Sequence, residues 1–390
     1  MCNTKLGSFC KQYLDWEERL AQEPYNLKIK RDDCYVMFSY DQIRSDFNVE
    51  LVREARGIIF REGEWEVPVC WAFNKFGNYG ESYAPEIDWS TAFVTEKVDG
   101  SLIKVWYDNG WHISTNGTID AFKANINNVK MPNFGTYFLK ALTKYYHDDD
   151  TCESWHAFTS RLETHRTYMF ELVGPYNRVV VPYEEPDIYF LGARTNASGE
   201  EYRCSGIIAG AMGLAAFPRP AQYSLSSLDD CLKAANLKTW DDEGFVVVDE
   251  NNNRVKIKSP AYVMAHFMRN NNIITRRHLI RVILENEVAE FMCYAADYKD
   301  SLQETQRLMN AYHYIGNRLA DIYRTTTTIL HKGDYARMVK TAPVIFQGLL
   351  FMNYDRDVTA QEYTAKWNEN KWEGYLEEME KLNKHILGEH

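Results

Sequence analysis

The chain has 390 residues, a formal net charge of −11 and a hydrophobic content of 45%, which fits an ordinary globular protein with room for two domains. No apolar run approaches the roughly 18 residues of a membrane-spanning helix, which excludes an integral membrane protein. The cysteines form no CxxC pair and the N-terminus lacks a signal-peptide core, so we expect a cytoplasmic protein without disulfides or a zinc centre.

Short β-branched and aromatic runs predict strands along the first 260 residues: Tyr35–Tyr40, Ala55–Phe60, Leu102–Tyr107, Tyr168–Leu172, Ile188–Ala193 and Gly244–Asp249. Asp108-Asn109-Gly110 is a hairpin signal. Helical periodicity appears at Asp120–Tyr146 and Ser226–Ala235. Because the strand spacing is irregular and βαβ alternation is absent, we predict an antiparallel-sheet α+β core.

The character of the sequence changes near Pro260. The segments beyond it are typical of helices, for example Arg277–Tyr298, Ser301–Tyr323 and Glu373–Leu387, with Thr359 as a helix start. We therefore predict an α+β domain over residues 1–262, with an N-terminal extension over 1–34, and an all-helical domain over 263–390.

Lys97 stands in the segment Lys97-Val98-Asp99-Gly100-Ser101, just before a predicted strand. A lysine acts as a nucleophile only after it loses its proton, which nearby cations or desolvation favour. Gly100 allows a phosphate to approach the backbone closely. A KxDG string is short, however, and a surface hairpin turn is the alternative interpretation.

Lys256 and Lys258 end the α/β part of the chain. In a strand they share one face, with Ile257 directed into the core. Two like charges on one face repel unless an anion lies between them, and a triphosphate would satisfy both. The alternative is an edge strand whose solvated lysines discourage aggregation.

Two glutamates lie at predicted strands. Glu171 has apolar neighbours, where a carboxylate is costly unless it is paired, hydrogen-bonded or metal-bound. Glu243 precedes the strand at 244–249 and is a candidate ligand for Mg²⁺, which prefers oxygen donors. An outward-facing strand residue and a turn residue are the respective alternatives. Upstream, Arg56 and Lys75 are candidate phosphate contacts or ordinary surface cations.

The order of these signals along the chain resembles that of covalent nucleotidyltransferases. KVDGS, YMFEL, DIYFLGA, EGFVVVD and VKIKS are similar to the successive motifs of that superfamily. Longer strings resemble RNA ligase 1 of the T-even bacteriophages: FSYDQ with Tyr40, EARGIIF with Arg56, KFGNYGE with Lys75, FELVGPYNRVVV with Glu171, and VKIKSPAY with Tyr262. The resemblance covers about residues 35–262.

The resemblance implies an ATP-dependent ligase that joins an RNA 3′-OH to a 5′-phosphate with Mg²⁺. Lys97 is the implied nucleophile, which forms lysyl-AMP and then adenylylated RNA. The implied ATP-binding residues are Tyr40, Arg56, Lys75, Glu171, Glu243, Lys256, Lys258 and Tyr262, with Glu243 and Glu290 as metal ligands. Tyr189 and Phe190 remain alternatives for stacking on adenine.

The sequence departs from the family at two places. Asn116 stands where a basic residue is usual, and Gly77 where an aromatic is usual. These changes put a phosphate contact and one pocket wall in doubt.

Partners implied by the family are broken single-stranded RNA, including tRNA, and a polynucleotide kinase/phosphatase that prepares the ends. The helical C-terminal domain favours this family over DNA ligases, and it implies RNA recognition by that domain. Its arginines, such as Arg276, Arg277 and Arg281, are candidate phosphate contacts or a solvated helix face. The alternatives are a ligase for generic single-stranded DNA or RNA ends and a non-catalytic nucleic-acid-binding protein.

Overall fold

The computed structural model describes residues 4–387 with the exception of Ile43, Asn127, 147–149, 268–273, Asn286, 289–290, 293–297 and 328–330. The chain divides into two compact units, residues 1–266 and 267–390. The division falls inside α8 (Pro260–Phe267), just after the predicted boundary at 262. Each unit has its own hydrophobic core.

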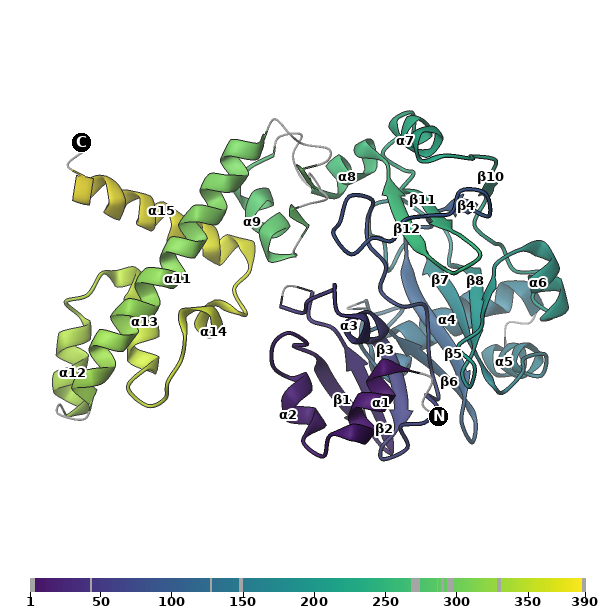
Figure 1. Cartoon of the computed structure of the whole chain (residues 1–390), viewed down its shortest axis with the longest axis horizontal. Coiled ribbons are helices and arrows are strands. Elements are labelled where there is room, and N and C mark those ends of the chain that lie inside the picture. Colours follow the sequence, from purple (N-terminus) through teal and green to yellow (C-terminus); the bar gives the residue numbers. More distant parts are fainter. Residues whose placement is uncertain are drawn as a thin grey trace. The chain divides into compact units, whose positions relative to one another are not determined.

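The first unit contains three antiparallel sheets (Figure 1). The three-stranded sheet has the order β1 (Lys28–Asp32), β2 (Tyr35–Ser39), β3 (Arg56–Arg61). The four-stranded sheet has the order β10 (Gln222–Tyr223), β4 (Phe93–Glu96), β11 (Gly244–Val248), β12 (Arg254–Lys258). The five-stranded sheet has the order β6 (Trp111–Thr115), β5 (Ser101–Tyr107), β7 (Arg166–Val173), β8 (Asp187–Thr195), β9 (Glu201–Arg203).

Helices cover one face of each larger sheet. Phe138 of α4 (Phe134–Tyr146) and Phe158 of α5 (Thr151–Thr159) pack on Phe170 of β7, and all three are fully buried. On the four-stranded sheet, Cys231 of α7 (Leu228–Asn236) joins Phe245 and other buried strand residues in a second cluster. The remaining helices of this unit are α1 (Lys5–Gln12), α2 (Trp16–Leu20), α3 (Glu50–Glu54) and α6 (Gly206–Ala211). The opposite faces of the two larger sheets are thus left for a pocket.

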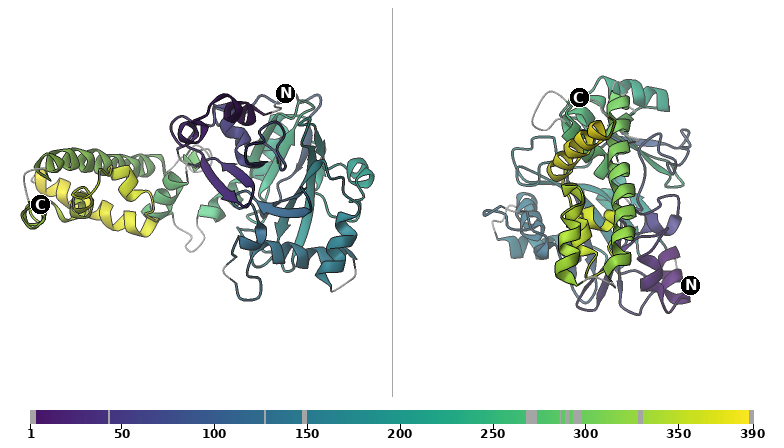
Figure 2. Two further views of the ribbon diagram at one scale, coloured as in Figure 1. Left: turned by 90° about the horizontal axis from the view of Figure 1, so that it is seen from below. Right: turned by 90° about the vertical axis from the view of Figure 1, so that its left-hand side faces the viewer.

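The second unit is helical throughout its described residues. It consists of α9 (Arg276–Leu284), α11 (Lys299–Thr327), α12 (Lys332–Val339), α13 (Val344–Met352), α14 (Ala360–Thr364) and α15 (Glu369–Leu387). The long α11 packs against α9, α13, α14 and α15 (Figure 2), and Tyr312, Phe346 and Trp372 meet in its core. Among the helices that the structure describes, none is long and apolar enough to cross a membrane.

The α+β prediction is confirmed, and each predicted strand lies in β2, β3, β5, β7, β8 or β11. The Asp108-Asn109-Gly110 hairpin joins β5 to β6 with Asn109 at φ +55°, and Thr359 caps α14. The helix predicted over Asp120–Tyr146 is wrong in its first half. Apart from the 3₁₀ turn Ala121–Lys123, only α4 is helical there, because Asn125, Asn128 and Asn133 with Pro132 oppose a helix.

Candidate active site

A pocket of about 290 Å³ lies between the bare faces of the four- and five-stranded sheets. Four of the predicted catalytic and ATP-binding residues line it: Arg56, Lys97, Glu171 and Lys256. They come from β3, the segment after β4, β7 and β12, so the fold gathers residues up to 200 positions apart. The volume is near the lower end of small-molecule sites, which run from roughly 300 to 1,000 Å³.

The four-stranded sheet presents its residues to the pocket in cross-strand rows. The register of β4, β11 and β12 aligns Phe93–Val248–Arg254 in one row and Thr95–Val246–Lys256 in the next. The third row is Lys97–Gly244–Lys258, in which the Lys97 amide donates to the Gly244 carbonyl at 2.8 Å. Side chains on alternate strand positions share a face, so Arg254, Lys256 and Lys258 form one ladder of cations. Ile257 between them is 1% exposed, as the alternation predicted.

Gly244 makes the third row possible. Its φ of +120° is unfavourable for other residues, and a Cβ there would lie 2.3 Å from the carbonyl oxygen of Ile257. The glycine therefore lets β11 and β12 stay close beside Lys97 and Lys258.

Lys97 is held by a buried carboxylate. Its Nζ lies 2.6 Å from Oε1 of Glu243, and Nζ of Lys258 lies 3.8 Å from the same oxygen. The side chain of Glu243 is 5% exposed and that of Lys97 is 22% exposed. The KxDG lysine thus faces a pocket with two charged neighbours, which is not the environment of a surface hairpin turn.

Asp99 fixes the backbone that follows Lys97. Its Oδ1 accepts a hydrogen bond from the buried Tyr262 hydroxyl at 2.9 Å, and its Oδ2 accepts from the amides of Val180 and Val181 at 2.8 and 2.7 Å. Tyr262, which the resemblance implies as an ATP-binding residue, therefore lies behind the pocket lining. Its hydrogen bond to Asp99 suits a role in holding the segment that carries Lys97.

Glu171 points from β7 into the pocket while its neighbours Phe170 and Leu172 are fully buried on the other face. It pairs with Leu102 of β5 and Tyr189 of β8. Burial raises the pKa of Glu171 to about 8, against the opposing effect of Lys97 and with the further repulsion of Glu243. Glu171 is therefore an inward-facing strand residue.

Arg56 has a guanidinium nitrogen that is available to bind an anion. Its Nη1 is buried and finds no hydrogen-bond acceptor within the described part of the chain. A buried donor of this kind calls for a partner, and the pocket beside it is the place for one. The amide oxygen of Asn116, also in the pocket lining, is buried and unbonded among the described residues. An uncharged group at 116 thus lies against the pocket, as the departure from the family predicted.

An aromatic ring borders the pocket next to Gly77, and it belongs to Phe76. Its ring lies 5.2 Å from the guanidinium of Arg56, 5.5 Å from that of Arg254 and 5.5 Å from Nζ of Lys256. The carbonyl of Gly77 accepts the Lys256 amide at 3.0 Å, which attaches this loop to β12.

Lys75 and Tyr40 lie together outside the pocket lining. The Lys75 ammonium is 5.4 Å from the centre of the Tyr40 ring and 5.1 Å from that of Phe47. Neither of the two adenine-stacking alternatives borders the pocket: Phe190 is fully buried in the core against Phe170, and Tyr189 is half-buried beside Glu171. Leu191, the next residue of β8, lines the pocket instead.

Glu243 is the described candidate for a metal ligand. Mg²⁺ is usually held by one or two carboxylates together with substrate phosphates, and the buried carboxylate of Glu243, in contact with the pocket residue Lys97, fits that pattern. The second predicted ligand, Glu290, lies outside the described residues.

Several charged residues near the pocket were not singled out from the sequence. Lys104 of β5 is 0% exposed, and its ammonium donates to the carbonyl of Gly57, next to Arg56. Burial lowers the pKa of Lys104. Arg203 and Arg254 line the pocket, and Glu201 pairs with Arg254. The alternation of β12 was the one available signal, since Arg254 stands two positions before Lys256.

The arginine run of the helical unit is already paired. Arg276, Arg277 and Arg281 of α9 form ion pairs with Glu380, Glu373 and Glu369 of α15, respectively. These arginines therefore link two helices through partly exposed ion pairs.

Several known proteins are similar to this chain. A family model described as RNA ligase matches residues 54–262. A putative bifunctional polynucleotide kinase/RNA ligase of Autographa californica nuclear polyhedrosis virus is 31% identical over 261 residues, covering 63% of this chain and 35% of that protein. The RNA ligase of Rhodothermus phage RM378 is 28% identical over 368 residues, or 79% of each chain.

The chain thus spans about a third of the baculovirus protein and about four fifths of the phage protein. Among solved structures, an archaeal ATP-dependent RNA ligase aligns with a TM-score of 0.41 and 13% identity, over 75% of this chain and 73% of that one.

Proposed function

The chain belongs to the RNA ligase family, whose model matches residues 54–262, and on this basis we propose that it is an ATP-dependent RNA ligase acting through Lys97. The observation that carries the proposal is the position of Lys97. It lies in the pocket lining with Arg56, Glu171 and Lys256, and its ammonium contacts Glu243. A nucleophile, a set of cations and inward carboxylates in one small pocket suit a nucleoside triphosphate.

The first step transfers AMP to the protein. The Nζ of Lys97 attacks the α-phosphorus of ATP, the bond from that phosphorus to the bridging oxygen breaks, and pyrophosphate leaves. Lys97 attacks as the neutral amine, and Lys258, Lys256 and Arg56 bring positive charge to the phosphates of the nucleotide. The same cations offset the charge that develops on the phosphate oxygens.

The two later steps complete the joining. An oxygen of the RNA 5′-phosphate attacks the phosphorus of lysyl-AMP, which returns Lys97 to its free form. The RNA 3′-OH then attacks the 5′-phosphorus, and AMP leaves with its electron pair. In this proposal Glu171 binds the ribose and Glu243 would hold Mg²⁺, which when bound would neutralise phosphate charge.

The substrate is, in this proposal, single-stranded or broken RNA, with tRNA among the candidates. The baculovirus relative is named as a kinase and ligase in one protein, which favours a partner that phosphorylates and dephosphorylates RNA ends. A ligase for generic single-stranded DNA or RNA ends is the second candidate.

Labelling with α-³²P-ATP and Mg²⁺ tests the proposal. We expect covalent label on the wild-type chain and none on Lys97→Ala, while Lys233→Ala, an exposed lysine of α7, still becomes labelled. Label on the Lys97→Ala variant would identify a different nucleophile, and an unlabelled wild type would reject the ligase. Competing 5′-phosphorylated RNA and DNA strands then distinguish the two substrate classes.

A further inference from the structure

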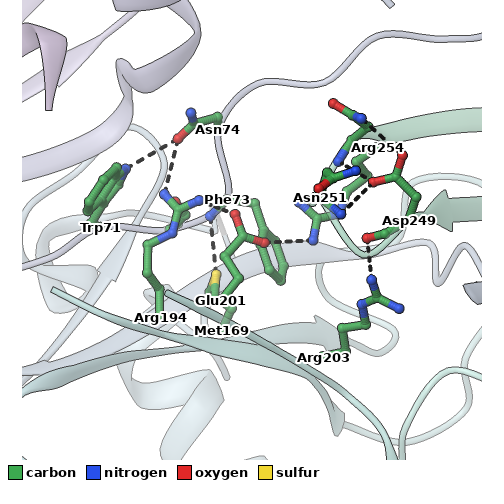
Figure 3. Close-up of polar contacts among 12 residues, drawn as sticks. Trp71, Phe73, Asn74, Met169, Arg194, Glu201, Arg203, Asp249, Asn251 and Arg254 are labelled. Carbon is green, nitrogen blue, oxygen red and sulfur yellow. Dashed lines mark hydrogen bonds and ion pairs between the residues drawn. The ribbon is translucent and has the colours of Figure 1, made fainter. Parts of the chain in front are cut away.

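Three buried charged side chains meet at the row of the pocket farthest from Lys97 (Figure 3). They are Arg194 of β8, Glu201 of β9 and Arg254 of β12, whose side chains are 5%, 5% and 9% exposed. The Glu201 Oε2 accepts a hydrogen bond from Arg254 Nη2 at 2.8 Å, and its Oε1 accepts one from Arg194 Nη2. We call these three residues the charged clamp.

The charged clamp joins two sheets. Arg194 and Glu201 belong to the five-stranded sheet, and Arg254 belongs to the four-stranded sheet. The pocket lies between these sheets, so the link from Glu201 to Arg254 restrains how far apart they stand.

The charged clamp also holds the segment 71–76, which carries Phe76. The guanidinium of Arg194 lies 4.3 Å from the centre of the Trp71 ring and donates to the Ala72 carbonyl at 2.7 Å and to the Asn74 side chain at 3.1 Å. The guanidinium of Arg254 lies 4.2 Å from the centre of the Phe73 ring. Figure 3 shows both arginines directed at this segment from opposite sides of Glu201.

Two members of the charged clamp lie outside the pocket lining. Arg194 and Glu201 do not border the pocket, whereas Arg254 does. Arg254 shares a strand face with Lys256, and both cations lie beside the Phe76 ring. Arg194 and Glu201 therefore act on a ligand through their neighbours, of which β12 and the segment 71–76 are the ones they contact by side-chain hydrogen bonds or ring contacts.

Stability alone does not account for such a group. Buried ion pairs are often replaced by apolar side chains without loss of stability, because desolvation offsets the attraction. Burial raises the pKa of Glu201, but Arg254 and Arg194 lower that pKa by more than burial raises it, so the carboxylate stays ionised. Its two guanidinium partners fix its geometry.

We propose that Glu201 is a positioning residue for the nucleotide. Through Arg254 it fixes the position of β12, and through Arg194 it fixes the position of the segment 71–76. Lys256, Arg56 and Phe76 can then surround one ligand. This inference rests on the proposed function, since it takes ATP as the ligand of the pocket. It concerns affinity and not the chemical step, because the charged clamp is remote from Lys97.

Calorimetric titration of the full chain with ATP tests the inference. Glu201→Gln removes the charge that both arginines share, and we expect its Kd for ATP to rise by about tenfold, within the range of such remote effects. Asp108→Asn is the matched control, because Asp108 pairs with Arg61 at 2.7 Å in the β5–β6 hairpin, away from the pocket lining. Its Kd should stay within about twofold of wild type.

Arg194→Met is the second variant, and it tests the positioning role if Glu201→Gln does not fold. It leaves Glu201 and Arg254 as a neutral pair, so no buried charge is uncompensated. We expect a rise of about threefold in the KM for ATP during self-adenylylation, with the rate at saturating ATP nearly unchanged.

The outcomes separate the two claims. Folded Glu201→Gln and Arg194→Met variants that bind ATP as wild type does would overturn the positioning role. A wild-type chain that binds no ATP would reject the proposed function itself.

Discussion

At the scale of single residues, Glu171 shows how the pocket alters a side chain. Its carboxyl has a pKa of about 8 in the folded protein, chiefly through burial, against an ordinary value of 4.5. The folded chain therefore keeps a proton that the unfolded chain releases between these values. The contribution of Glu171 to stability is fully present below pH 4.5 and is lost as the pH rises to about 8.

Glu171→Gln should remove this dependence. Glutamine has a similar shape and no charge, so we expect the variant to exceed wild type in free energy of unfolding by a few kcal/mol above pH 8, at about 1.4 kcal/mol for each unit of pKa shift. The difference should shrink towards pH 4.5. Urea unfolding across this pH range measures it, with the exposed Glu64→Gln as control. Parallel pH profiles for wild type and Glu171→Gln would contradict the burial of this charge.

Some site residues could be predicted from the sequence, and others could not. Glu171 and Lys256 stood out because a charge at an alternate position of an apolar strand must face something. Glu201 did not, because its neighbours Gly199, Glu200 and Tyr202 are typical of a polar turn. Its burial depends on Arg194 and Arg254, and the pairing with Arg254 exists only after the two sheets have packed.

At the scale of elements, α9 and α15 show that a cluster of arginines in sequence need not be a nucleic-acid surface. The side chains of Arg281 and Glu369 are 24% and 23% exposed, and those of Arg277 and Glu373 are 49% and 22% exposed. Partly exposed ion pairs of this kind contribute about 0.2–1 kcal/mol each.

The double variant Arg277→Gln/Arg281→Gln separates the two roles. We expect the helical unit to lose about 1 kcal/mol of stability while affinity for a 5′-phosphorylated single-stranded RNA changes by less than about twofold. Filter binding measures the affinity, and urea unfolding followed by circular dichroism measures the stability. A tenfold loss of RNA affinity with unchanged stability would restore these arginines as phosphate contacts.

Elements were predicted well where hydrophobic pattern decides them. The apolar runs of β5, β7 and β11 are buried on both sides by helices and by the pocket lining, so their composition is distinctive. The two-residue strand β10 was missed because its partner lies far away along the chain, in β4, where Thr95 pairs with Gln222. The register of β4, β11 and β12, which brings Lys97 level with Lys258, likewise depends on pairing between distant parts of the chain.

At the scale of the whole molecule, each unit has the core of an independent folding domain. The pocket residues lie within residues 56–256, and Tyr262, which supports Asp99, still belongs to the first unit. The helical unit buries its own cluster around Tyr312, Phe346 and Trp372.

A fragment of residues 1–267 should therefore fold and label itself with α-³²P-ATP. We expect its rate of adenylylation to lie within about tenfold of the full chain, since the residues proposed for that step are all present. The same fragment with Lys97→Ala is the control. A fragment that is folded by circular dichroism but takes up no label would show that the helical unit contributes to the first step.

The ion pair of Lys97 with Glu243 also has a consequence for timing. In this ion pair the Nζ of Lys97 is directed at Glu243, and the pair must open before Lys97 can attack a phosphate. Glu243 is at once the counter-ion of Lys97 and the proposed oxygen donor for Mg²⁺. A metal held by this carboxylate would compete with Lys97 for it and would leave the lysine side chain available to ATP. The reactivity of the lysine would then be latent until its substrate is present.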